Sequence, residues 1–414
     1  MKSWADLSPG THGDHVKIST PLSLYNTANA KIEPVPVKDF YRLYVCGITP
    51  YDATHLGHAA TYVAFDLINR FLRFSGAQVL FVENITDIDD PLLERAARDG
   101  VDWSDLALSQ IELFRGDMVA LHVIPPDHYI GVVEAMAVIV DAVSELEKKG
   151  STYKVDDDLY FRVRLDPEFL TRTHLSPEVA MEYFAERGGD PQRIGKEDPF
   201  DALVWKAQRD GEPGWPSPFG IGRPGWHIEC SAIALSYLKP NLADEFAIDI
   251  QGGGSDLIFP HHDMSAAQGL VATGQKFARF FVHAGMIGLD GTKMSKSLGN
   301  LIFVSKLISE GVEPMAIRLA LLNHHYRSDH MWRATEIPEA SAFLQRIRLN
   351  LARIEVAPTE ELISNIVTAL ADDLDTVRVL QEIDQWCEAT EAGASGGSPG
   401  HLSRVLDDLL GLAI

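Results

Sequence analysis

A strand, a helix and a second strand follow one another within residues 40–82, and no other feature constrains the fold as strongly. Residues 40–46 are aromatic and β-branched, which is typical of a buried strand. Apolar side chains recur at helical spacing over residues 60–74, and residues 78–82 are again strand-like. Because strands joined by a helical crossover lie parallel in one sheet, the sequence predicts an α/β fold.

Further patterns divide the rest of the chain. Helical periodicity runs over residues 103–122 and 129–149, and strand patterns return at residues 246–250 and 279–282. We therefore expect an insertion between two halves of one α/β domain. The expected regions are a loosely ordered lead-in at 1–34, a catalytic domain at 35–124 and 200–330, an inserted α+β region at 125–199 and a C-terminal helical domain at 331–414.

The charge balance argues against a polyanionic partner. The 414 residues carry 36 Lys and Arg against 59 Asp and Glu, a formal net charge of −23 at pH 7. Such a chain lacks the positive field that attracts nucleic acid, and no apolar run approaches the roughly 18–20 residues of a membrane helix. The three cysteines are too scattered for a disulfide framework. We expect a cytoplasmic protein with no nucleic-acid or membrane partner.

The segment Cys46–His58 lies where the first predicted strand ends and the helix begins. Backbone N–H groups and the helix dipole favour anions at that place. His55 and His58, one helical turn apart, add charge or hydrogen bonds for phosphate oxygens. By itself, such a segment is more often a hydrogen-bonded turn than a nucleotide site.

Two glycine-rich segments are further candidates. Residues 291–300 form a lysine-bearing loop of a kind that closes over a triphosphate and offsets the charge of a leaving pyrophosphate. A solvated loop is the alternative. Residues 252–256, with the sequence Gly-Gly-Gly-Ser-Asp, follow a predicted strand, where chain reversal beside a ligand needs residues without a Cβ. A tight turn explains the same glycines.

Cys46, Cys230 and the pair His261 and His262 offer the thiolate and imidazole ligands that zinc prefers. Three protein ligands leave an open position for a substrate. The segments lie far apart in the sequence, however, and a buried free cysteine is the usual alternative. For Cys387, in the helical tail, a buried structural thiol is the expectation.

Taken together, these segments resemble a known family. Residues 55–58 and 293–297 resemble the two signature motifs of class I aminoacyl-tRNA synthetases. Residues 223–231 and 252–262 are similar to cysteinyl-tRNA synthetase in particular. The resemblance implies a Rossmann-like class I catalytic domain, ATP with Mg²⁺, and one Zn²⁺ per chain.

Three departures point away from the synthetase itself. An acidic helical region, with a net charge of −8 from Met331 on, stands where the synthetase continues into an anticodon-reading domain. Ser265 occupies the position of a further acidic zinc ligand. Residues 186–191 resemble a segment of the mycothiol cysteine ligases, a family of cysteinyl-tRNA synthetase homologues.

The resemblance to these ligases implies an ATP-dependent, AMP-forming enzyme that acts as a monomer. Its substrates are L-cysteine, ATP and the amine of 1D-myo-inositol 2-amino-2-deoxy-α-D-glucopyranoside (GlcN-Ins), which are joined through a cysteinyl adenylate. Cysteine transfer to tRNA is the alternative activity, and a non-catalytic synthetase-like regulator is a second alternative. The base that deprotonates the amine is not identified, although carboxylates of residues 84–90 are candidates.

The resemblance also assigns site residues. The implied metal ligands are Cys46, Cys230 and His261, and the implied catalytic residues are His55, His58, Lys293 and Lys296. The adenylate is expected to contact Cys46, Gly47, Ile48, Thr49, Thr61, Asn84, Ile85, Thr86, Trp226, Gly254, Ser255, Asp256 and Ile287.

Overall fold

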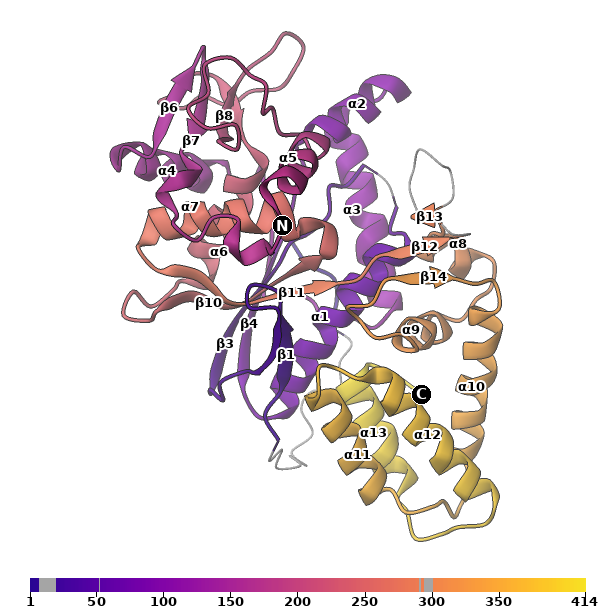
Figure 1. Ribbon diagram of the computed structural model, residues 1–414. Coiled ribbons are helices and arrows are strands. Elements are labelled where there is room, and N and C mark those ends of the chain that lie inside the picture. The colour runs from indigo at the N-terminus through magenta and orange to yellow at the C-terminus, as the bar shows by residue number, and fades with distance from the viewer. Residues whose placement is uncertain (7–19, 52, 290–291, 294–300) are drawn as a thin grey trace.

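A parallel sheet of five strands forms the centre of the computed structural model (Figure 1). The structure describes residues 1–6, 20–51, 53–289, 292–293 and 301–414, of which residues 292–293 are described in their backbone only. The strands lie in the order β11 (Lys276–Ala284), β10 (Phe246–Gly254), β3 (Phe40–Val45), β4 (Gln78–Ile85) and β5 (His128–Gly131). Every neighbouring pair is parallel, which confirms the α/β prediction.

Helices cover both faces of this sheet because its strands are buried on both sides. Leu43 and Val45 pack with α1 (Leu56–Phe74) and α3 (Trp103–Ala120), whereas Tyr44 faces the other core. The helices of that second core are α4 (Met136–Lys148), α6 (Trp226–Leu238) and α7 (Asp263–Thr273). Alternation along β3 therefore also turns Cys46 toward α6 and α7.

The sequence prediction errs where an apolar run is short. The helix predicted from residue 129 begins only at Met136, because residues 128–131 form β5 of the central sheet. A short apolar run fits a buried strand as well as a helix, and pairing with β4 decides between them. The helix predicted over residues 103–122 is confirmed as α3, which is followed by the turn at Leu121.

Residues 20–34 are not the loosely ordered lead-in that their composition suggested. They contain a hairpin of β1 (Ser23–Asn26) and β2 (Lys31–Pro34), in which Leu22 and Leu24 are buried. The backbone N–H of Thr27 donates to the carbonyl of Phe281 on β11, at 2.9 Å. The segment is ordered by contacts with β11 and the core, and amino-acid composition gives no information about such contacts.

The inserted region has a sheet of its own, and its boundaries differ from those expected. Four antiparallel strands form it: β6 (Thr152–Val155), β7 (Asp158–Phe161), β8 (Ala202–Ala207) and β9 (Gly222–Pro224). The insertion thus extends beyond residue 199, whereas β5, which was assigned to it, belongs to the central sheet. Its helical segments are α5 (Pro177–Glu186) and two short turns at Val163–Leu165 and Thr171–Thr173.

The remaining elements follow the central sheet along the chain. A small sheet contains β12 (Ile287–Leu289), β13 (Thr292–Lys293) and β14 (His330–Trp332). The helices after it are α8 (Val304–Ser309), α9 (Pro314–Leu322), α10 (Glu336–Leu351), α11 (Glu360–Ala371), α12 (Thr376–Glu391) and α13 (Pro399–Leu410). Helix α2 (Asp90–Asp99) lies beside α3.

Cys387 is fully buried in α12, as expected. None of the described helices combines the length and the apolar character that crossing a bilayer requires.

A buried ionic cluster fastens the C-terminal helices to the catalytic domain. Arg318 donates to the carbonyl of Leu410 at 2.6 Å, to that of Leu121 at 2.7 Å, and to Asp66 at 2.5 Å. Arg70 donates to the same carboxylate at 2.7 Å. Burial opposes ionisation of Asp66, but the two guanidinium groups hold its pKa below its usual value. One carboxylate on α1 thus organises contacts to α9 and α13.

We expect Arg318→Met to lower the free energy of unfolding by about 3–5 kcal/mol, because the buried Asp66 carboxylate loses one of its two guanidinium partners and two carbonyls lose the Arg318 donor. The matched control is Arg348→Met, which breaks a pair with Glu313 whose two side chains are 34% and 45% exposed. The control should cost less than about 1 kcal/mol. Urea unfolding of both variants measures the difference, and equal losses would contradict a special role for the cluster.

Candidate active site

The carboxyl ends of β3, β4 and β10 meet at one edge of the sheet, where parallel α/β sheets bind their ligands. The N–H of Cys46 donates to the carbonyl of Gly252, and the N–H of Gly47 donates to Asn84 Oδ1, both at 3.0 Å. The N–H of Thr86 donates to the carbonyl of Ile48, also at 3.0 Å. Two of the segments expected to hold the adenylate, Cys46–Thr49 and Asn84–Thr86, are therefore hydrogen-bonded to each other, and the first is also bonded to the strand that leads into Gly254.

Glycine is required here by close approach and not by chain reversal. A Cβ on Gly47 would stand 1.6 Å from the carbonyl oxygen of Asn84, and one on Gly252 would stand 2.2 Å from the Phe65 ring. Neither residue has a positive φ. The tight turn considered for residues 252–256 is therefore not the reason for Gly252, which lies within β10.

His55 and His58 form a stacked pair at the start of α1. Their ring centroids are 3.8 Å apart, and His55 Nδ1 caps the helix by accepting from the backbone N–H of His58. Burial, followed by the neighbouring His55, lowers the pKa of His58 well below its usual value. His58 Nδ1 is buried without a hydrogen-bond partner among the described residues. In this state His58 offers a hydrogen bond and not a positive charge.

The flanks of the lysine loop lie against the same helix start. The N–H of Leu56 donates to the carbonyl of Ile302 at 2.9 Å, and the N–H of Val304 donates to that of Thr54 at 3.0 Å. Lys293 pairs with Gly288 in the small sheet, in which Ile287 also lies. Lys296 falls outside the described residues, so its expected role stays a prediction.

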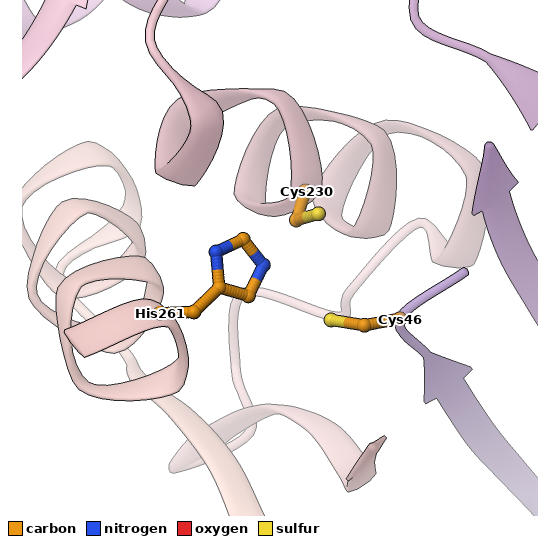
Figure 2. A group of neighbouring side chains, drawn as sticks. All are labelled: Cys46, Cys230 and His261. Carbon is orange, nitrogen blue, oxygen red and sulfur yellow. The ribbon is translucent and has the colours of Figure 1, made fainter. Parts of the chain in front are cut away.

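Cys46, Cys230 and His261 come together as Figure 2 shows, although they belong to β3's end, α6 and the turn Ile258–His262. Their ligand atoms all lie within 4.8 Å of one another, and all three side chains are buried. Burial, followed by the hydrogen bond with Cys46, raises the pKa of the Cys230 thiol. Two thiols and an imidazole so placed fit a zinc ion with an open position.

A shell of histidines surrounds this group and orients it. His227 Nδ1 lies 3.0 Å from His261 Nδ1, which leaves Nε2 of His261 as the nitrogen available to a metal. The Trp226 ring stacks on His261, with centroids 4.3 Å apart. Ser265 occupies the position at which the synthetase has a further, acidic zinc ligand. Its Oγ donates to the carbonyl of His227 at 3.3 Å.

A hydrogen-bonded chain leads from Cys46 to the N-terminal hairpin, and the sequence reasoning missed it. His262 Nε2 lies 3.3 Å from Cys46 Sγ, and His262 Nδ1 lies 2.8 Å from His283 Nε2. His283 Nδ1 lies 2.8 Å from Thr27 Oγ1. The position of His283 at the carboxyl end of a predicted strand was the available signal, because such ends meet at one edge.

The carboxylates after β4 have distinct environments. Burial raises the pKa of Asp87 and of Asp89 to about 6 in each case. Asp89 lies near Glu229, whose pKa burial raises well above its usual value. Asp90 instead forms ion pairs with Arg223 and, at 3.0 Å, with Lys206. Of the candidate bases, Asp89 and Asp87 therefore titrate nearest to neutral pH.

Arg187 is another residue that sequence reasoning left without a role. It lies just after α5 in the segment that resembles the ligases, and its Nη1 donates to the carbonyls of Asp256 and Phe259. The guanidinium also lies over the Tyr183 ring, 4.5 Å from the centroid. One cation of the insertion thus holds the Gly254–Asp256 segment and the turn that carries His261.

Comparisons with known proteins agree with this geometry. The family model described as tRNA synthetases class I (C) catalytic domain matches residues 34–342. Among solved structures, the Mycobacterium tuberculosis methionyl-tRNA synthetase in complex with methionyl-adenylate is similar at a TM-score of 0.65, with 17% identity over 91% of this chain and 89% of that one. The fold and the site together define a class I synthetase-type catalytic domain.

Closer relatives define the family. The chain is 52% identical to the L-cysteine:1D-myo-inositol 2-amino-2-deoxy-alpha-D-glucopyranoside ligase of Gordonia bronchialis, over 100% of both chains. It is also 52% identical to the ligase of the same name from Thermomonospora curvata, over 95% of both chains. The chain belongs to this family of ligases, which confirms the resemblance seen in the sequence.

We expect Arg187→Ala to lower ATP–pyrophosphate exchange by about 10–100-fold, because two hydrogen bonds from a charged group are lost. The loss should appear mainly in the KM for ATP, since Arg187 positions a binding segment and touches no reacting atom in this arrangement. Arg187→Lys should recover little, because an ammonium lacks the planar fork of donors. Arg164→Ala, which removes an exposed cation of the same insertion, is the control and should be neutral. An unchanged KM in Arg187→Ala would refute this role.

Proposed function

We propose that this chain is a cytoplasmic, monomeric ligase that joins L-cysteine to the amine of GlcN-Ins at the expense of ATP. The observation that carries the proposal is the buried group of Cys46, Cys230 and His261 beside the converging strand ends. The names of relatives that are 52% identical over 95–100% of this chain support the same reaction.

Cys46, Cys230 and His261 would hold Zn²⁺. The ion would supply Lewis acidity and a coordination position for the thiolate of the substrate cysteine, a ligand for which a serine hydroxyl is a poor substitute. Ser265 adds no negative charge to the group, so two thiolates are its only anionic protein ligands. Trp226, stacked on His261, would form one wall of the aminoacyl pocket.

In the first half-reaction, the carboxylate of cysteine attacks the α-phosphate of ATP, and cysteinyl adenylate and pyrophosphate form. The stacked pair His55 and His58 would donate hydrogen bonds to phosphate oxygens, and Lys293 and Lys296 would offset their charge. Mg²⁺ would accompany ATP. The backbone of Cys46–Thr49, together with Thr61, Asn84–Thr86, Gly254–Asp256 and Ile287, would hold the adenylate.

In the second half-reaction, the amine of GlcN-Ins attacks the activated carbonyl, an amide bond forms and AMP leaves. The amine must first lose a proton, and the raised pKa values of Asp87 and Asp89 suit that task at neutral pH. The inserted region, from β6 to β9 with α5, would shape the acceptor pocket. We propose that this inserted region, the catalytic domain and the helices after Met331 are three separate domains.

We expect purified protein to contain one equivalent of zinc bound through thiolates, and Cys230→Ser to abolish both that metal and cysteinyl-adenylate formation. Loss of a thiolate ligand removes most of the affinity of such a site. Elemental analysis and ATP–pyrophosphate exchange measure the two effects. Cys387→Ser, which removes a buried thiol far along the chain in α12, is the control. Full exchange activity in Cys230→Ser would refute the proposal for the metal.

The choice of acceptor separates the ligase from a synthetase and from a non-catalytic regulator. Incubation with ATP, radiolabelled cysteine and either GlcN-Ins or tRNA should label only GlcN-Ins, with release of one AMP for each amide formed. Labelled tRNA would establish a synthetase. Adenylate binding without labelling of either acceptor, in protein that contains its zinc, would establish a regulator.

A further inference from the structure

A second group of metal-ligating side chains lies outside the site described above. His324 follows α9, His330 begins β14 and Glu336 begins α10, so three elements of different direction meet there (Figure 1). The ligand atoms of these three side chains all lie within 4.8 Å of one another. The proposed ligase reaction uses none of them.

The carboxylate of Glu336 lies against both imidazoles. Oε2 lies 3.1 Å from His324 Nε2 and 3.1 Å from His330 Nε2. Oε1 lies 2.9 Å from His330 Nε2, and it also accepts from the backbone N–H of Arg333 at 3.0 Å and from its guanidinium at 3.3 Å. Ligands about 2.0–2.1 Å from a tetrahedral metal are about 3.3 Å apart, so the two Oε2 separations match such a centre closely.

The charges and burial of this group also suit a cation. The carboxylate of Glu336 is 2% exposed, and a buried carboxylate needs a positive partner. Arg333 supplies only part of this compensation, because its side chain is 61% exposed.

A small cavity gives access to the group. It has a volume of about 30 Å³ and is lined by His324 and His330 together with residues of α1 and with Ile287. This volume exceeds the roughly 10–15 Å³ that one water requires. A water molecule in the cavity would supply the fourth ligand that two histidines and one carboxylate leave open.

We propose that His324, His330 and Glu336 bind a divalent transition-metal ion of the zinc class, as a second metal site distinct from the cysteine-ligated one. Two imidazoles and a carboxylate form a ligand set that zinc, cobalt and nickel accept, whereas Mg²⁺ prefers oxygen ligands only. Because His330 pairs with Ile287 across β14 and β12, the ion fastens α10 to the sheet that continues into Lys293. The site stands independently of which acceptor the enzyme uses.

Cobalt titration of the metal-free full-length protein tests the proposal, since Co²⁺ bound to thiolates absorbs in the near ultraviolet and Co²⁺ bound to histidine and carboxylate does not. Wild-type protein should bind two equivalents, only one of which has the thiolate absorption. Glu336→Gln should lose the equivalent without that absorption, with affinity at least tenfold lower. His324→Gln should do the same, and the retained thiolate absorption shows in each variant that the protein is folded.

The matched control is His401→Ala, which removes a histidine of α13 that is not one of the three proposed ligands and should leave both equivalents in place. Cys230→Ser should keep the equivalent without thiolate absorption. Binding of that equivalent with unchanged affinity in both Glu336→Gln and His324→Gln would overturn the assignment. A single equivalent in wild-type protein, lost on Cys230→Ser, would also overturn it and leave a hydrogen-bonded cluster.

Discussion

The close approach of β3, β4 and β10 at their carboxyl ends is the constraint on which the rest of the site depends. Gly47 and Gly252 permit it, because a Cβ on either would overlap Asn84 or Phe65. The backbone N–H groups that become available at such an edge, and the start of α1 beside them, favour a phosphorylated ligand. Alternation along β3 then turns Cys46 to the face on which α6 and α7 pack.

Contacts from residues outside the group of Cys46, Cys230 and His261 position its side chains. His262 and Cys46 are 216 residues apart in the chain, yet the sulfur and the ring nitrogen are 3.3 Å apart. The chain of His262, His283 and Thr27 extends this contact to the N-terminal hairpin. Arg187, within the insertion, donates to the carbonyl of Phe259 in the turn that carries His261. Such outer contacts orient ligands and fix their tautomers.

The helices after Met331 are bound to the catalytic domain by buried charge. Asp66 on α1 accepts from Arg70 and Arg318, and Arg318 in turn donates to the carbonyl of Leu410 at the end of α13. The acidic character of this region weighs against a nucleic-acid partner, in keeping with relatives whose names specify a small-molecule acceptor. His330 in β14 pairs with Ile287 in β12, so the cluster of His324, His330 and Glu336 lies close to Ile287.

The sequence by itself determined the α/β class, the helices after residue 331 and the family, because local periodicity and the motifs at residues 55–58, 223–231 and 252–262 are contiguous features. Residue type also made Cys46, Cys230 and the pair His261 and His262 candidates for zinc, but their spacing carries no signal, and the resemblance was needed to select Cys46, Cys230 and His261 as ligands. Only the tertiary structure decided that residues 23–34 form an ordered hairpin, how far the insertion extends, and which contacts Arg187 and His283 make. Those features arise from contacts between residues far apart in the chain, and the burial and pairing that fix them have no local signature.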